Sequence, residues 1–189
     1  MRIRFLILFL LFISSISFGQ STVKCLIKTS QGNIHIKLYP KKAPITVTNF
    51  LRYVDANLYI DSSFFRTCTP ENEAERTIKI EVIQGGNIPE NSGFDPIVIE
   101  TTNTTKIKHK NGTLSMARGK PNSATSSFFI CINKQAELDF NGKRNPDGQG
   151  FAAFGRVTKG MKVVKKIQQQ ENKNQQLTNP IKIYSIKRL

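Results

Sequence analysis

The sequence contains few of the residues on which most enzyme mechanisms depend. It has only two histidines, His35 and His109, and neither lies in a pattern typical of a Ser-His-Asp triad. Histidines, cysteines and carboxylates show no spacing that resembles a metal site, and Gly85-Gly86 lacks the lysine of a phosphate-binding loop. We expect His35 to be solvated and His109, which lies among lysines, to have no catalytic partner. An enzyme built from this chain should work without a nucleophile, a metal or another cofactor.

Acidic residues are also few, with 13 Asp and Glu against 28 Lys and Arg, which gives a formal net charge of +15. Such a charge is compatible with a nucleic acid or another anionic partner. However, the lysines are scattered, and no compact basic run is interleaved with aromatic residues. We therefore expect no nucleic-acid partner and interpret the charge as a source of solubility.

The three cysteines, Cys25, Cys68 and Cys131, allow at most one disulfide and one free thiol. The sequence does not reveal whether such a pair forms, and three buried or isolated thiols are the simpler interpretation.

The N-terminus resembles a secretory signal peptide. A basic start at residues 1–4 precedes an almost wholly apolar run, Phe5–Ile16, and the small residue Gly19 fits a cleavage site. An uncleaved anchor helix is the alternative, although the apolar run is short for a membrane span. We therefore predict a signal peptide over residues 1–19 and a single domain over residues 20–189. The mature protein should be periplasmic or secreted, monomeric, and without stable membrane insertion.

Residue periodicity predicts many short strands and two helices. Alternating or continuous apolar residues predict strands over residues 23–30, 33–39, 62–66, 78–83, 97–100, 128–132, 151–157 and 181–186. Helical spacing predicts helices over residues 44–57 and 160–169, and the acidic segment 67–77 is predicted to be an exposed loop. Because the strands do not alternate regularly with helices, a closed, largely antiparallel barrel with helices at its ends is expected.

The stretch Gly112–Ile132 joins an apolar strand pattern to a long loop of small and polar residues. Such a loop, attached to a buried strand, is suited to bind an extended peptide, but composition alone favours an ordinary connection between two core strands.

Short motifs in a fixed order identify a resemblance to the cyclophilins, which are peptidyl-prolyl cis-trans isomerases. The matching segments are Ala43–Phe50, Phe64–Arg66, Ile83–Gly86, Leu114–Arg118, Pro121–Ala124, Phe128–Ile130, Leu138-Asp139, Phe154–Val157 and Gly160-Met161. Each motif is weak alone, whereas the ordered set over residues 23–188 is very specific. The resemblance implies a mainly β fold, a closed eight-stranded antiparallel barrel capped by two α-helices, and proline-containing polypeptides as substrates.

The resemblance also implies site residues. Arg66 would donate a hydrogen bond to the proline nitrogen of the twisted amide, and Gln84 would position the substrate carbonyl; a surface arginine is the alternative for Arg66. The proline ring would enter an apolar slot formed by Val82, Phe129 and Leu138, with Phe151 at its rim. The peptide would run alongside Ala117, Arg118 and Gly119.

Four residues depart from the family pattern. Phe65 replaces a histidine, Glu81 aligns with an aromatic residue, and Ser127 replaces a glutamine. Glu137 stands where a tryptophan or another large residue is usual, which predicts weak binding of cyclosporin-like macrocycles. With the long insert at residues 67–80, these changes leave a second functional hypothesis, a non-catalytic protein that holds peptides in the same groove.

Overall fold

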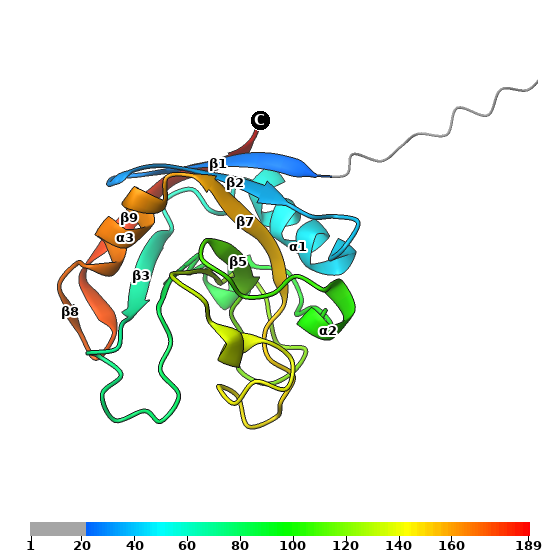
Figure 1. Ribbon diagram of the computed structural model, residues 1–189. Coiled ribbons are helices and arrows are strands. Elements are labelled where there is room, and N and C mark those ends of the chain that lie inside the picture. The colour runs from blue at the N-terminus through cyan, green and yellow to red at the C-terminus, as the bar shows by residue number, and fades with distance from the viewer. Residues whose placement is uncertain (1–21) are drawn as a thin grey trace, which may run out of the picture.

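A closed barrel of eight antiparallel strands dominates the computed structural model, which describes residues 22–189 (Figure 1). The predicted signal peptide, residues 1–19, lies outside this range. The barrel strands are β1 (Val23–Thr29), β2 (Gly32–Leu38), β3 (Ser63–Cys68), β4 (Val82–Gly85), β5 (Thr113–Met116), β6 (Phe128–Cys131), β7 (Ala153–Lys159) and β9 (Gln176–Arg188). Their order is β1-β2-β7-β5-β6-β4-β3-β9, and β9 pairs with β1 to close the barrel. The predicted barrel is confirmed.

Helices lie against the barrel, with α1 (Pro44–Asp55) and α3 (Met161–Gln168) on opposite sides of the strands in Figure 1. These are the two predicted helices, and a third, α2 (Thr102–Thr105), spans only four residues. Two short 3-10 helices, Glu90–Ser92 and Ala136–Leu138, complete the helical elements of residues 22–189. Within this range, no helix combines the length and apolar character that a membrane span requires.

The core fills the barrel because alternate strand residues point inward. Ile34, Ile36 and Leu38 of β2 are buried, while the residues between them are partly exposed. One face of α1 closes an end of the barrel with Phe50, whose ring centroid lies 5.2 Å from Phe154 and 5.4 Å from Phe128. This core orients the strands that carry the functional side chains.

Three strand predictions need correction. Residues 97–100 form only an isolated bridge between Ile97 and Ala124. β4 begins at Val82, so residues 78–81 of the predicted strand lie outside it. The last strand runs from Gln176 to Arg188, and its start pairs with β8 (Asn172–Lys173), a two-residue strand that was not predicted.

All three cysteines are buried and free. Burial raises the pKa of the thiols of Cys25 and Cys68 to about 11 in each case, and it raises the pKa of Cys131 as well. The thiols are therefore protonated near neutral pH. The structure thus agrees with three buried thiols, the simpler interpretation of the sequence.

Candidate active site

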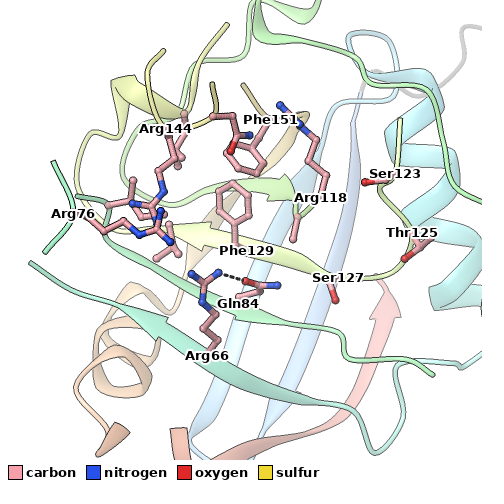
Figure 2. A pocket seen from close by; sticks show the side chains of 15 residues that line it. Arg66, Arg76, Gln84, Arg118, Ser123, Thr125, Ser127, Phe129, Arg144 and Phe151 are labelled. Atoms are coloured by element: carbon pink, nitrogen blue, oxygen red, sulfur yellow. Dashed lines mark hydrogen bonds between the residues drawn. The ribbon is translucent and has the colours of Figure 1, made fainter. Parts of the chain in front are cut away.

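A groove with a volume of about 400 Å³ lies over the outer faces of β3, β4 and β6, between the insert 67–80 and the loop 139–150. Figure 2 shows Phe129 at its centre, with Arg66 and Gln84 on one side and Phe151 on the other. Eight of the nine sequence-predicted site residues line the groove, namely Arg66, Val82, Gln84, Ala117, Arg118, Phe129, Leu138 and Phe151. Gly119 is the predicted residue that does not.

The apolar slot arises from strand alternation. Phe128 of β6 points into the barrel core, so its neighbour Phe129 points out into the groove. There Phe129 packs edge-on against Phe151, with 5.3 Å between ring centroids. Val82 and Leu138 join Phe129 in a small hydrophobic cluster that is separate from the main core. The slot is therefore preformed, and its apolar character suits a proline ring.

Arg66 reaches the groove because of a β-bulge in β3. Phe64 pairs with Gly85 and Arg66 pairs with Gln84, so Phe65 is an extra residue on the β3 side. Simple alternation would point Arg66 to the same face as the core residue Phe64, and the bulge re-aims it. The Arg66 guanidinium then donates from Nη1 to Gln84 Oε1 over 2.9 Å.

The side chain of Arg118 supports one wall of the groove. Its Nη1 and Nη2 atoms donate to the Asp147 carboxylate over 2.7 and 2.8 Å, and Nε donates to the Gly150 carbonyl. The hydrogen bond from Arg118 is the main cause that lowers the pKa of Asp147. The Arg118 guanidinium also lies 5.3 Å from the ring centroid of Phe151. Arg118 therefore holds the loop 139–150 in place.

The backbone beside Arg118 has few donors left for a peptide. The Ala117 amide donates to the Ser127 carbonyl over 2.8 Å, and the Gly119 amide donates to Ser123 Oγ over 3.1 Å. Within residues 22–189, the Arg118 amide makes no hydrogen bond. Of the three predicted peptide-binding residues, Arg118 thus offers the available backbone N–H.

Sequence reasoning missed several residues of the groove. The insert contributes Ile80 and Arg76, and the loop 139–150 contributes Arg144 (Figure 2). Glu73, predicted to lie in an exposed loop, is 2% exposed. The alternation of Ile80 with Val82 was a usable signal, because it places the two side chains on one face. No local pattern marked the two arginines or the buried glutamate.

His109 has two hydrogen-bond partners that its sequence neighbours do not indicate. Its Nδ1 lies 2.8 Å from Asp139 Oδ1, and its Nε2 lies 2.9 Å from Ser115 Oγ. Because a carboxylate only accepts, Nδ1 carries the proton and Nε2 accepts from the serine. The three side chains are hydrogen-bonded in the order of a Ser-His-Asp triad. However, Ser115 is fully buried, so no substrate can reach it. The ring of His109 instead stacks behind Phe129, at 6.0 Å.

Comparisons with known proteins agree with this geometry. A family model described as "Cyclophilin type peptidyl-prolyl cis-trans isomerase/CLD" matches residues 24–188. The chain belongs to the cyclophilin family. Like its relatives, this cyclophilin is a peptidyl-prolyl cis-trans isomerase that acts on proline-containing peptides.

Bacterial enzymes are among the relatives of this cyclophilin. A "Peptidyl-prolyl cis-trans isomerase" of Acinetobacter baylyi is 41% identical over 145 residues, which cover 74% of this chain and 69% of that one. "Peptidyl-prolyl cis-trans isomerase B" of Escherichia coli is 37% identical over 144 residues, which cover 74% and 80%. A crystal structure of a cyclophilin-type isomerase of Cryptosporidium parvum, 20% identical, has a TM-score of 0.68 and covers 89% and 98%. The fold and the isomerase activity predicted from the motifs are confirmed.

Proposed function

We propose that this cyclophilin isomerises X-Pro bonds of exported proteins and that Arg66 stabilises the twisted amide. The rotation has a barrier of roughly 18–20 kcal/mol because the planar amide loses its resonance. Catalysis therefore requires only that the enzyme bind the twisted amide better than either planar form. The observation that supports this function is the Arg66 guanidinium, held by Gln84 beside the slot that contains Phe129.

The chemistry of arginine suits the step. In the twisted amide, the proline nitrogen becomes pyramidal and can accept a hydrogen bond. Arginine donates at any physiological pH, since its guanidinium does not lose its proton. Arg66 uses Nε, one Nη1 hydrogen and one Nη2 hydrogen for contacts with Gln84 and Gln175. Each terminal nitrogen retains one N–H for a substrate in the groove.

The test is the cis–trans exchange of an Ala-Pro peptide, followed by NMR, with the parent protein, Arg66→Ala and Arg156→Ala. Arg66→Ala should lower turnover about 10²–10³-fold, as expected for the loss of one preorganised transition-state donor. Peptide binding should change far less. Arg156→Ala is the matched control, because it removes an exposed arginine outside the groove and should leave turnover unchanged. An unchanged rate in Arg66→Ala would refute the assigned role, whereas binding without acceleration by the parent would indicate a peptide-holding protein.

The cellular site rests on the N-terminal pattern at residues 1–19. We propose export to the periplasm or beyond, removal of this segment before Gln20, and a mature monomer that neither inserts into membranes nor binds nucleic acid. N-terminal sequencing of the protein from the exported fraction should begin at Gln20. Recovery of the intact N-terminus from the membrane fraction would instead favour an anchor helix.

A further inference from the structure

The turn between β8 and β9 has an unusual residue for its conformation. Asn174 and Gln175 have φ angles of 50° and 71°, and they link the paired residues Lys173 and Gln176. A two-residue hairpin turn with two positive φ angles favours Asn-Gly, because a side chain at the second position is strained there. Glutamine at position 175 is thus locally unfavourable, so an interaction elsewhere should account for its presence.

The side chain of Gln175 provides that interaction, because it contacts Arg66. Its Oε1 atom accepts from Arg66 Nε over 3.0 Å and also from Arg66 Nη2. On its other side, Gln175 Nε2 donates to Glu73 Oε1 over 3.2 Å. A carboxylate accepts and a guanidinium donates, so the amide group fits between them in one orientation only.

Glu73 is itself held in place by three hydrogen bonds from two residues. Its carboxylate accepts from Arg144 Nη1 over 2.9 Å, from Arg144 Nη2, and from the Ile80 amide over 2.8 Å. Glu73 is 2% exposed and the Arg144 side chain is 8% exposed. The buried carboxylate therefore has a paired charge and little freedom to turn away from Gln175.

We propose that Gln175 is a positioning residue that holds the Arg66 guanidinium in its working orientation, and that Glu73 acts through Gln175. The proposal rests on the function proposed for Arg66. Without Gln175, two of the three nitrogens of Arg66 lose their acceptor, and Gln84 alone restrains the group. A displaced donor weakens stabilisation of the twisted amide more than it weakens binding of the planar peptide.

The decisive variant is Gln175→Gly, because it separates thermal stability from turnover. If Gln175 only supported the fold, the variant would lose thermal stability, whereas a positioning role predicts a loss of turnover in a stable protein. Glycine adopts the positive φ without strain, so the fold should keep or gain thermal stability. The kcat for an Ala-Pro peptide should nevertheless fall about 10–10²-fold, with KM changed much less. Asn174→Gly is the matched control, since it adds the same flexibility to the turn without removing a contact to Arg66.

Two further measurements isolate the pathway through Arg66. In the parent protein the Nε–H of Arg66 should exchange slowly with solvent by NMR, and in Gln175→Gly it should exchange faster. Glu73→Gln should lower kcat in the parent background but add nothing in the Gln175→Gly background, because it acts through that side chain. A further loss of kcat in the double variant would refute the role assigned to Glu73.

The outcomes separate this inference from the proposed function. A fall in kcat in Gln175→Gly but not in Asn174→Gly supports the positioning role. If Arg66→Ala abolishes turnover while Gln175→Gly leaves kcat unchanged, the inference fails and the role of Arg66 stands. An equal loss in Asn174→Gly would attribute the effect to turn flexibility and would also overturn the inference. If Arg66→Ala leaves turnover unchanged, both proposals fail.

Discussion

Ile80 faces the groove, and its neighbour Glu81 turns away from it. Ile80 is 7% exposed and packs in the cluster with Val82 and Phe129, whereas Glu81 Oε1 accepts from Asn133 Nδ2 over 3.0 Å. The alignment of Glu81 with a family aromatic residue therefore does not describe the wall. In this chain the insert supplies an isoleucine to the wall, and the carboxylate is kept out of the slot.

Replacement of Ile80 by alanine should therefore impair the groove, whereas replacement of Glu81 should not. Ile80→Ala removes buried apolar contacts and should destabilise the fold by about 2 kcal/mol. It should also raise KM for an Ala-Pro peptide several-fold, because the slot loses part of its wall. Urea unfolding and peptide kinetics measure the two effects. Glu81→Ala, at the adjacent position, is the control, and a larger rise of KM in that variant would contradict this assignment.

The buried His109 should make the fold sensitive to acid. Burial lowers the pKa of His109 below its usual 6.5, and the hydrogen bond and charge of Asp139 offset this only in part. Below about pH 6.5, His109 therefore binds a proton more readily in the unfolded chain than in the folded chain. The free energy of unfolding should fall as the pH decreases from 7.5 to 5. Urea titrations at fixed pH values within this range measure the slope.

The comparison of the two histidines tests this assignment. His109→Asn keeps a donor for Asp139 but removes the titrating ring, so the slope should flatten. This variant should also be about 1–3 kcal/mol less stable at pH 7, because Ser115 loses its acceptor. The control is His35→Asn, the same substitution at a partly buried histidine outside this cluster. Equal slopes in the parent and in His109→Asn would show that another group governs the acid sensitivity.

A carboxylate from outside the helix caps α1. Ala43 precedes the helix and provides no side-chain cap, but Glu100 accepts from the Ile45 and Thr46 amides over 3.2 and 2.7 Å. A negative charge there satisfies the free N–H groups and interacts favourably with the helix dipole. Glu100→Gln should lower the free energy of unfolding by about 1–2 kcal/mol. Glu75→Gln, at an exposed glutamate, should have no measurable effect in the same urea titration.

Periodicity predicted the features that depend on neighbouring residues. Alternation along a strand is imposed by the backbone, so the inward positions of Ile34, Ile36 and Leu38 could be inferred from the sequence. The positions of Val82, Gln84 and Phe129 in the groove were instead implied by the resemblance to the cyclophilins. The helix at Pro44 was predictable for the same reason, because its apolar residues recur at helical spacing. The ordered motifs extended this information to the family and to its activity.

Local patterns failed where one residue altered the register or where a loop became part of a wall. The bulge at Phe65 shifts Arg66 to the groove face, and an alternating pattern contains no sign of an extra residue. The segment 78–83 has the alternation of a strand, but β4 begins only at Val82. Ile80, whose amide donates to Glu73, lies in the wall of the groove instead. Alternation therefore predicted correctly that Ile80 faces the same side as Val82. It predicted wrongly that residue 80 belongs to a paired strand.

The sequence by itself determined most strands and the two longer helices, because backbone geometry makes their patterns repeat along the chain. Its ordered motifs determined the isomerase family, and that resemblance implied the groove-facing apolar residues. The tertiary structure alone decided the polar partners. Thr46 and Glu100 are 54 residues apart, Glu73 and Arg144 are 71 apart, and Arg66 and Gln175 are 109 apart. A buried polar group must find a partner wherever the fold brings one. The identity of that partner leaves no periodic pattern in the sequence, because it depends on which distant segments the closed barrel places side by side.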